Sequence, residues 1–349
     1  MHLKRDDLKD LTTSLIGVEP PFLPAIQIQH PRSLDITPIS NEFMLKGDES
    51  IDCSVNSPVF SIAIKQFTAR RNRPHQGLFI PKLIRAQKDS LLFDLARIRW
   101  DSPYASELLI DSRIDTKRTY FINVIRPLIN LAASTQSSVL LHAALAQWSG
   151  IGILMPGNSG DGKTTLAILS AFQGHKVVTD DLTLIAAHNN QLFGKALRDH
   201  IYVRRETFKH IPKNIKSAAV EGMFLTEKKH TLLRENLAEF TLASSGIDML
   251  LFPQISNHKP YNKAYRIQTL SKTEALVQLL KSIDPLLMKM MDESSRSRTI
   301  NTLRVLVKKC VCMSLTTTPL LLQSPETHIS NLVDQVLERY SACKNASCE

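Results

Sequence analysis

A glycine-rich segment that ends in a lysine and two threonines has the residue types and spacing for phosphate chemistry. Residues 157–165 read GNSGDGKTT, which satisfies the pattern Gly-x-x-x-x-Gly-Lys-Thr from Gly157 onward. Glycines allow the backbone to curl so that successive N–H groups point at phosphate oxygens. The ammonium group of Lys163 can reach β- and γ-phosphates, and the hydroxyl of Thr164 suits Mg²⁺, which prefers oxygen ligands. The segment therefore predicts a site for a nucleotide triphosphate and its metal ion.

The residues around this loop predict the strand and helix that the motif requires. Apolar residues 151–156 precede the loop and predict a strand, while apolar residues between 166 and 172 predict a helix that ends near Gly174. A helix that starts near Lys163 adds the positive end of its dipole to the site. The alternative is a glycine-rich turn with a solvated lysine. The predicted nucleotide-binding residues of the loop are Gly157, Asn158, Ser159, Gly160, Asp161, Gly162, Lys163, Thr164 and Thr165.

Two adjacent carboxylates follow the next predicted strand. Residues 175–181 read HKVVTDD and end in Asp180 and Asp181. In a parallel sheet the carboxyl end of this strand lies beside the phosphate loop. One acid can then hold Mg²⁺, directly or through water, while the other accepts a proton from an attacking hydroxyl group. Mutual repulsion and partial burial should raise the pKa of one of the two, which suits a general base. The alternative is a helix N-cap with a solvated neighbour.

A single histidine precedes the loop in the chain. Residues 140–147 predict a strand that a tight turn joins to strand 151–156, and His142 lies in the first of the two strands. A lone histidine on an apolar strand is usually a satisfied core residue. Because its strand is next to the strand of the loop, His142 can also face the same cleft.

Other segments have the periodicity of regular secondary structure. Apolar residues between 119 and 134 form a helical stripe, in which Pro127 should produce a kink. Ser271 and Glu274 predict a capping box, and Pro325 with the apolar stripe that follows predicts a last helix through residue 340. The predicted strands in the remaining sequence are 58–66, 91–100 and 247–255.

Composition excludes several classes of protein. Of 349 residues, 43% are hydrophobic and 22% are charged, so a mainly disordered or fibrous chain is not expected. No window has the roughly 18 uninterrupted apolar residues of a membrane-spanning helix. The first residues lack the apolar core of a secretory signal, so we expect a cytoplasmic protein without a membrane partner. Five cysteines, an odd number, do not indicate a disulfide framework.

The chain carries more basic than acidic side chains. Lysine and arginine number 43 against 33 aspartates and glutamates, a formal charge of +10 that favours an anionic partner. Stretches 65–88 and 195–216 concentrate the excess. Neither interleaves aromatic residues densely enough for base stacking, so no nucleic acid is expected. We interpret the first stretch as a solvated face, whereas the second lies near the predicted chemistry.

Three motifs in this order resemble a known family. The segments LHAALAQ, GNSGDGKTT and GHKVVTDD lie between residues 141 and 181. They resemble the histidine-containing strand, phosphate loop and acidic strand of the C-terminal catalytic domain of bacterial HPr kinase/phosphorylase and of HPr-kinase-related serine kinases. The resemblance covers residues 138–185 closely and residues 138–340 loosely. It implies a compact α/β domain related to the phosphoenolpyruvate carboxykinases.

The resemblance also implies a division of the chain. It does not cover the first 115 residues, whose beginning is rich in proline and has no helical period. We expect residues 1–115 to form a small β-rich or α+β region with a role in substrate recognition. Residues 116–345 are expected to form the P-loop, HPr-kinase-like catalytic domain.

The resemblance assigns a role to each candidate residue. Lys163 and the loop amides bind the phosphates of ATP, and Thr164 is a ligand of Mg²⁺. Asp181 accepts the proton of a serine hydroxyl group, and Asp180 supports the metal ion or the substrate. His142 becomes a catalytic-site histidine.

The sequence departs from the family after the acidic pair. Family members carry a Glu-x-Arg-Gly signature whose glutamate helps to hold the metal ion, whereas residues 200–208 here read HIYVRRETF. Arg204 and Arg205 are present without a following glycine, and the only acid, Glu206, is displaced. Phosphorolysis and HPr as substrate are therefore not implied. Either arginine can neutralise charge at the γ-phosphate or hold an acidic substrate; the alternative is a solvated basic edge.

These observations predict ATP- and Mg²⁺-dependent transfer of the γ-phosphate to a serine hydroxyl group of a peptide or protein. The chain resembles the HPr-kinase-related proteins found with peptide-modification systems more than the HPr kinases themselves, and some of those proteins phosphorylate a serine on a peptide. One alternative is a nucleotide-binding switch or ATPase with little kinase activity, and another is a small-molecule kinase that acts on free serine. Related kinases assemble as oligomers, so a homo-oligomer is a further expectation.

Overall fold

The chain folds into two compact units. The computed structural model describes residues 11–17, 25–31, 46–47, 59–67, 83–87, 90–93, 96–102, 105–111, 119–135, 138–188, 191–198, 200–224, 227–256, 263–283 and 285–346. The first unit comprises Met1–Ser138 and Pro285–Thr299, and the second comprises Val139–Asp284 and Ile300–Glu349. Among the described helices, none combines the length and apolar character needed to cross a membrane.

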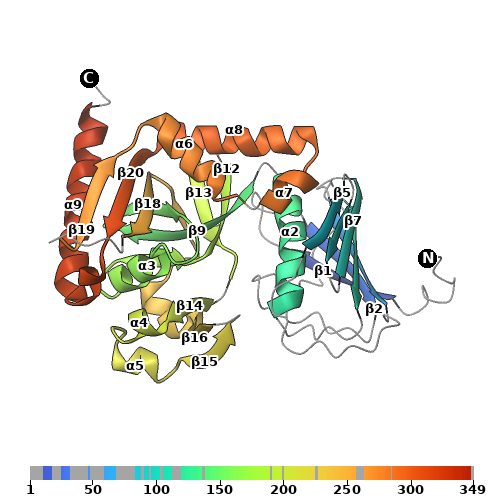
Figure 1. Cartoon of the computed structure of the whole chain (residues 1–349), viewed down its shortest axis with the longest axis horizontal. Coiled ribbons are helices and arrows are strands. Elements are labelled where there is room, and N and C mark those ends of the chain that lie inside the picture. Colours follow the sequence, from blue (N-terminus) through green and yellow to red (C-terminus); the bar gives the residue numbers. More distant parts are fainter. Residues whose placement is uncertain are drawn as a thin grey trace. The chain divides into compact units, whose positions relative to one another are not determined.

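The first unit is built on an eight-stranded sheet with the order β3-β1-β2-β4-β8-β7-β6-β5 (Figure 1). Strand β4 pairs in parallel with both β2 and β8, and the other pairs are antiparallel. The strands are β1 (Leu11–Gly17), β2 (Ala25–Pro31), β3 (Lys46–Gly47), β4 (Val59–Phe67), β5 (Leu83–Gln87), β6 (Ser90–Phe93), β7 (Ala96–Ser102) and β8 (Ala105–Asp111).

Strand β4 shows why this sheet has a buried face. Phe60, Ile62 and Ile64 are fully buried, while the residues between them are partly exposed. This period of two directs alternate side chains to one side of the sheet. The predicted strand 58–66 is thereby confirmed. The predicted single strand 91–100 is wrong, because Leu91 pairs with Ile98 across two antiparallel strands, β6 and β7. The two residues between these strands, Asp94 and Leu95, include no glycine or proline that would mark a turn in the sequence.

Helix α2 (Thr119–Thr135) also belongs to the first unit. Its predicted apolar stripe is buried at Val124, Ile125 and Leu128, and Pro127 lies inside the helix. It packs against α7 (Pro285–Met290), a segment far away in the sequence. The compact unit therefore extends beyond the expected boundary at residue 115. A role of residues 1–115 in substrate recognition stays a prediction.

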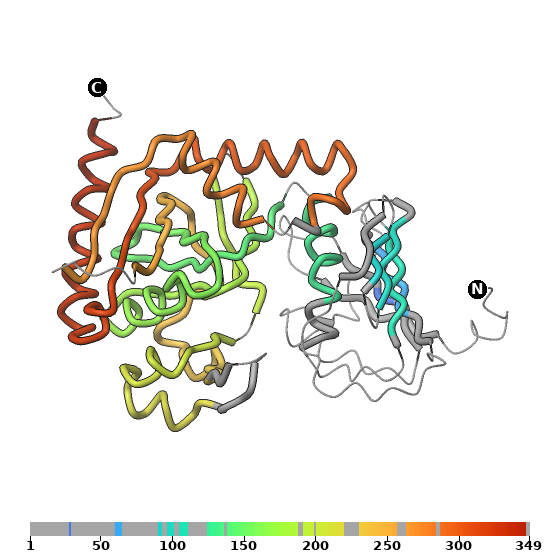
Figure 2. The backbone as a smooth tube through the Cα atoms, in the orientation of Figure 1, coloured from blue at the N-terminus to red at the C-terminus, as the bar shows by residue number. Residues whose placement is uncertain are grey.

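The second unit contains a nine-stranded sheet of mixed direction (Figure 1). Figure 2 traces the backbone of this unit from green near residue 139 to red at the C-terminal helix. Its order is β17-β13-β12-β9-β10-β18-β20-β19, with β11 also paired to β9. The α/β class predicted from the sequence is confirmed. The strands are β9 (Val139–Trp148), β10 (Ile151–Pro156), β11 (Lys176–Thr179), β12 (Leu182–His188), β13 (Gln191–Ala196), β17 (Ser244–Gly246), β18 (Met249–Ile255), β19 (Tyr265–Thr269) and β20 (Val311–Thr317).

Helices cover this sheet and close its core. Helix α3 packs against β9 and α9, and the indole N–H of Trp148 donates to the hydroxyl group of Ser170 at 2.9 Å. The capping box predicted at Ser271 is present at the start of α6. The helices are α3 (Lys163–Ala171), α4 (Arg205–Phe208), α5 (Lys213–Lys216), α6 (Lys272–Lys281), α8 (Glu293–Lys309, shared by both units) and α9 (Pro325–Ala346), with short 3₁₀ segments η2 (Arg234–Phe240) and η3 (Pro319–Leu322).

A small antiparallel sheet lies with α4 and α5 beside the main sheet of the second unit (Figure 1). Its order is β14-β16-β15. The strands are β14 (His200–Arg204), β15 (Val220–Phe224) and β16 (Glu227–Leu233). Ile201 and Val203 on β14 are buried in the same hydrophobic core as α3, so this small sheet is fixed against the helix that follows the glycine-rich loop.

Strand β9 sets the positions of the candidate residues. On one edge it pairs with β10 as far as Pro156, which lies opposite Ala143. On the other edge β11 pairs up to Leu145 and β12 resumes at His142. The loop after β10 and the break between β11 and β12 therefore flank the same part of β9. At about 4.8 Å per strand spacing, they lie about 10 Å apart across it.

Candidate functional site

The glycine-rich loop joins β10 to α3 in the predicted order of strand, loop and helix. Helix α3 begins at Lys163, and Gly162 precedes it with a φ of 93°. Gly160 has a φ of 96°. This left-handed region disfavours residues with a Cβ atom, which gives both glycines a conformational reason in the loop.

Lys163 lies folded against its own loop. It is 4% exposed, and its Nζ donates hydrogen bonds to the carbonyl oxygens of Gly157 at 2.8 Å and Asn158 at 2.6 Å. Burial lowers the pKa of Lys163, an effect that nearby carboxylates oppose. The loop is closed from its other side by Asp161, whose Oδ2 accepts the backbone N–H of Asn158 at 2.5 Å.

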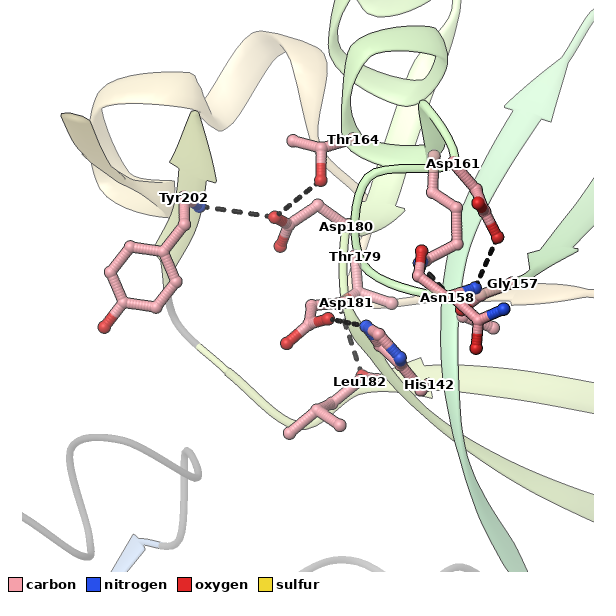
Figure 3. Close-up of polar contacts among 12 residues, drawn as sticks. His142, Gly157, Asn158, Asp161, Thr164, Thr179, Asp180, Asp181, Leu182 and Tyr202 are labelled. Carbon is pink, nitrogen blue, oxygen red and sulfur yellow. Dashed lines mark hydrogen bonds and ion pairs between the residues drawn. The ribbon is translucent and has the colours of Figure 1, made fainter. Parts of the chain in front are cut away.

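Asp180 is held between the loop helix and the small sheet, as Figure 3 shows. Its Oδ2 accepts the hydroxyl group of Thr164 and the backbone N–H of Tyr202, each at 3.3 Å. Asp180 is 2% exposed, and within the described residues its Oδ1 has no hydrogen-bond partner. Burial, together with the negative charge of Asp181, raises the pKa of Asp180 to about 6.

Asp181 has a different environment from its neighbour. Its Oδ1 lies 2.6 Å from Nε2 of His142, and its Oδ2 accepts a hydrogen bond from a guanidinium nitrogen of Arg198, also at 2.6 Å (Figure 3 shows the histidine contact). Burial opposes ionisation, but the hydrogen bond from His142 and the charge of Arg198 outweigh it and hold the pKa of Asp181 well below its usual range.

The carboxylate pair thus has one raised and one lowered pKa. The sequence predicts that one pKa is raised, and this is the pKa of Asp180. The prediction that the acidic pair lies beside the loop because the two strands are neighbours in a parallel sheet is wrong in one respect. Strands β10 and β11 are not hydrogen-bonded to each other. Both run antiparallel to β9, on its two edges, and therefore run in the same direction. Their carboxyl ends still meet because β9 lies between them.

One cavity of about 280 Å³ gathers most of the candidate residues. A volume of this size suits a phosphate chain and a reacting group more than a whole nucleotide. Gly157, Asn158 and Asp161 belong to the loop but are not part of the cavity wall. The predicted residues that line it are His142, Ser159, Gly160, Gly162, Lys163, Thr164, Thr165, Asp180, Asp181 and Arg204.

The two predicted arginines separate in the structure. Arg204 lines the cavity, and its guanidinium group lies 3.8 Å from the position that a Cβ atom on Gly160 would take. Arg205 is exposed and does not line the cavity. Glu206, although displaced in the sequence, does line it. An acid is therefore present at this wall, but on α4 and not on β14.

Several residues of the site have no signal in the sequence. Arg198 is 3% exposed. It belongs to the basic stretch 195–216, which the sequence places near the predicted chemistry without singling out Arg198. A further part of the wall comes from Ile255 at the end of β18, beside Gly162, and from the segment 317–322 around η3. These residues lie more than 70 positions from the loop, and no local motif marks them.

The oxygen atoms of Thr164 and Asp180 could hold a divalent cation. The partnerless buried Oδ1 of Asp180 is the observation that favours this, since a buried carboxylate oxygen normally has a partner. Among the described residues no group of three or more His, Cys, Asp or Glu side chains forms a complete metal cage. Mg²⁺ commonly uses one or two protein ligands and takes the rest from water and phosphate, so this incomplete set fits it.

Strand, glycine-rich loop and helix follow one another with Lys163 and Thr164 at the helix start, which is the order that the Gly-x-x-x-x-Gly-Lys-Thr pattern predicts. The sequence similarity of the chain is to HPr kinase/phosphorylase. The protein of that name from Treponema pallidum (strain Nichols) is 37% identical over 81 residues, 23% of this chain and 24% of that protein. The one from Clostridium beijerinckii is 40% identical over 78 residues, 22% of this chain and 25% of that protein. No protein-family model matches the chain.

The chain spans about a quarter of the length of these curated relatives. Among solved structures, the Hpr(Ser) kinase/phosphatase of Coxiella burnetii matches with a TM-score of 0.29 and 13% identity, over 59% of this chain and 96% of that chain. The predicted resemblance is therefore confirmed by the sequence matches.

Proposed function

We propose that this protein is a kinase that transfers the γ-phosphate of ATP, with Mg²⁺, to a serine hydroxyl group of a peptide or protein. The observation that carries the proposal is the convergence of Lys163, Thr164, Asp180 and Asp181 on one cavity. These residues come from the loop helix and from the break between two strands. Phosphoryl transfer asks mainly for positioning and for neutralisation of charge, and these are the groups that supply both.

The loop would hold the phosphate chain of ATP. Lys163 now donates to two carbonyl oxygens of its own loop, and an incoming phosphate would offer its ammonium group a stronger, charged acceptor. The N-terminal end of α3 adds its dipole and free N–H groups. Arg204, beside Gly160, would add positive charge at the far end of the chain of phosphates.

Mg²⁺ would be held by Asp180 and Thr164. When bound, the ion neutralises phosphate charge and orients the phosphoryl group. The contribution of the protein is a carboxylate that is already fixed by Thr164 and by the N–H of Tyr202. Because the cytoplasm supplies ATP and Mg²⁺, we place the reaction there.

Asp181 would take the proton of the serine hydroxyl group. A bond forms between the serine oxygen and the γ-phosphorus, the bond to the β–γ bridging oxygen breaks, and ADP leaves. A carboxylate of low pKa is a weak base, but the loose transition state of phosphoryl transfer asks more for orientation than for basicity. His142 and Arg198 supply that orientation by holding both oxygens of Asp181.

A nucleotide-binding switch or ATPase is the second candidate. The contacts of Asp181 with His142 and Arg198 favour this candidate. They occupy both carboxylate oxygens, so an acceptor hydroxyl group has to share or displace one of them to reach Asp181. Transfer to free serine differs from the main proposal only in the size of the acceptor.

The test is incubation of the full chain with Mg²⁺ and γ-labelled ATP, with a library of serine-containing peptides, with free serine, or without acceptor. We expect label on peptides and a mass gain of one phosphoryl group. Lys163→Ala should abolish labelling, whereas Lys281→Ala, an exposed lysine on α6, should leave it unchanged. Consumption of ATP that no acceptor accelerates would indicate the switch, and labelling of free serine alone would indicate the small-molecule kinase.

A further inference from the structure

A second cavity lies directly beyond α4. It measures about 700 Å³ and lies between the end of α3, the segment that joins α4 to α5, and the start of α9. Phe172 and Pro212 contribute apolar surface to its wall, whereas Leu169 and Ile211 are almost fully buried, and Lys209 and Lys213 contribute cationic side chains. Glu326 is the single acid among the described residues that line it.

The cations on this side are not used by the fold. Lys209 and Lys213 are exposed, and within the described residues neither side chain forms an ion pair or hydrogen bond. The exposed Arg205 on the same segment has no such partner there either. Exposed lysines are often only solvated, but here they line a hollow that also has some apolar surface at Phe172 and Pro212, which is a surface that can hold a peptide chain.

The backbone that carries these cations is rigidly held. The hydroxyl groups of Thr207 and Thr165 are 2.7 Å apart, which fixes α4 to the first turn of α3. The ring of Phe208 stacks on His230 with centroids 3.5 Å apart. Lys216 donates to the carbonyl oxygen of Lys209 at 2.7 Å. Because the backbone is held in place, the ordering cost of binding an anionic segment falls on the lysine side chains and not on the segment that carries them.

The second cavity is close to the first along the chain. Thr207 lines the first cavity and Lys209 lines the second, so their Cα atoms are at most about 7 Å apart. Lys213 follows four residues later on the same wall. An extended peptide covers about 3.3 Å per residue, so a chain whose serine occupies the first cavity reaches these lysines within about two to six residues.

We propose that this cationic groove, whose exposed cations are Lys209 and Lys213, binds an acidic segment of the acceptor peptide two to six residues from its serine, with an apolar side chain of that segment against Phe172 and Pro212. The inference rests on the proposed function in that it takes the acceptor to be a peptide. Charge complementarity selects the partner: the overall charge of +10 favours anions, and the groove concentrates unpaired cations beside the reaction site.

The test measures binding of fluorescent 15-residue peptides, in which alanine replaces the central serine, to the full chain without ATP. The first peptide carries glutamates and a leucine at positions three to six residues from the centre, on both sides. The second, matched peptide has the same leucine and a glutamine in place of each glutamate. We expect the glutamate peptide to bind at least about fivefold more tightly. The variant K209E/K213E should lose this preference and should favour a third peptide that carries lysines.

The control variant K281E/K308E makes the same change of charge at exposed positions on α6 and α8, away from both cavities. It should keep the preference for glutamate. Equal affinity of the wild-type chain for the glutamate and glutamine peptides would overturn the inference, as would equal losses in the two variants. Binding of an ATP analogue is measured separately. If the chain binds the analogue but does not discriminate between the peptides, the groove proposal alone is refuted. If the chain does not bind the analogue, the proposed function alone is refuted.

Discussion

Asp180 and Asp181 are neighbours in the chain with opposite electrostatic environments. Asp180 is buried next to the negative charge of Asp181, and both effects outweigh the hydrogen bond from the N–H of Tyr202, so its charged form is disfavoured. Asp181, with 27% of its side chain exposed, lies between His142 and Arg198, so its charged form is favoured. The difference separates their proposed roles: the carboxylate with a partnerless oxygen suits a metal ion, and the ionised one suits an acceptor hydroxyl group.

Asp181→Asn should suppress phosphoryl transfer and leave nucleotide binding intact. The amide keeps the shape of the side chain but does not accept the serine proton, and loss of a positioned base typically costs 10²–10⁴-fold in rate. Single-turnover transfer and the affinity for an ATP analogue should be measured together. Asp334→Asn on the exposed face of α9 is the control. A parallel loss of binding and transfer would show that Asp181 acts through the metal ion or the fold.

Asp180→Asn should stabilise the protein in a buffer without metal ion or nucleotide, and more so at pH 7.5 than at pH 4.5. The fold raises the pKa of Asp180 from 3.8 to about 6. The contribution of Asp180 to the free energy of unfolding is therefore fully present below pH 3.8 and is lost as the pH rises through 6. The loss is on the order of 3 kcal/mol at neutral pH. Thermal unfolding at the two pH values tests this, and a stabilisation that does not change with pH would contradict it.

Between β10 and α3, the glycine-rich loop works as one element. Two of its glycines adopt positive φ, and Lys163 and Asp161 each bond back to the loop backbone. The loop therefore has its shape before any phosphate binds. Preformed N–H groups avoid an ordering cost when the ligand arrives.

Gly160→Ala should weaken the binding of an ATP analogue by about tenfold or more. A Cβ atom at a φ of 96° costs about 1–2 kcal/mol and shifts the loop. Gly150→Ala is the matched control, because Gly150 has a φ of 85° in the β9–β10 turn and no atom within 4 Å of the added group. Both variants should lose similar stability in denaturant. Equal binding by the two variants would mean that the loop conformation is not needed for the nucleotide.

At the scale of the whole molecule, charge is the dominant feature. The formal charge is +10 and the pI is about 9.4, so the field of the protein attracts anions of every kind before any contact forms. The groove beside α4 would turn that general attraction into selection of an acidic acceptor.

For kinetics, the glutamate and glutamine peptides carry serine at the central position in place of alanine. Raising NaCl from 50 to 500 mM should increase the KM for the glutamate peptide by about tenfold. The KM for the glutamine peptide should change by less than twofold, because salt screens charges that face solvent. Initial rates at saturating ATP provide the measurement. The same salt dependence for both peptides would show that the effect arises at the triphosphate and not at the acceptor.

Local interactions made parts of this protein predictable. The pattern from Gly157 to Thr164 predicts a strand, a loop and the start of a helix, because each of its residues restricts or contacts backbone only a few positions away. The same holds for the capping box of Ser271 and Glu274. The prediction of one strand over 91–100 was wrong because neither of the two residues between β6 and β7, Asp94 and Leu95, is a glycine or proline that would mark a turn.

The sequence by itself determined the type of loop, the presence of adjacent acids at the next strand end and the resemblance to a kinase family. Only the tertiary structure decided which acid is ionised, because the partners of Asp181, His142 and Arg198, lie 39 and 17 residues away from it. It also decided that Ile255 and η3 close the cavity and that Lys209 and Lys213 line a second one. Such contacts depend on strand register and on packing between distant segments, and no local pattern of residues encodes either.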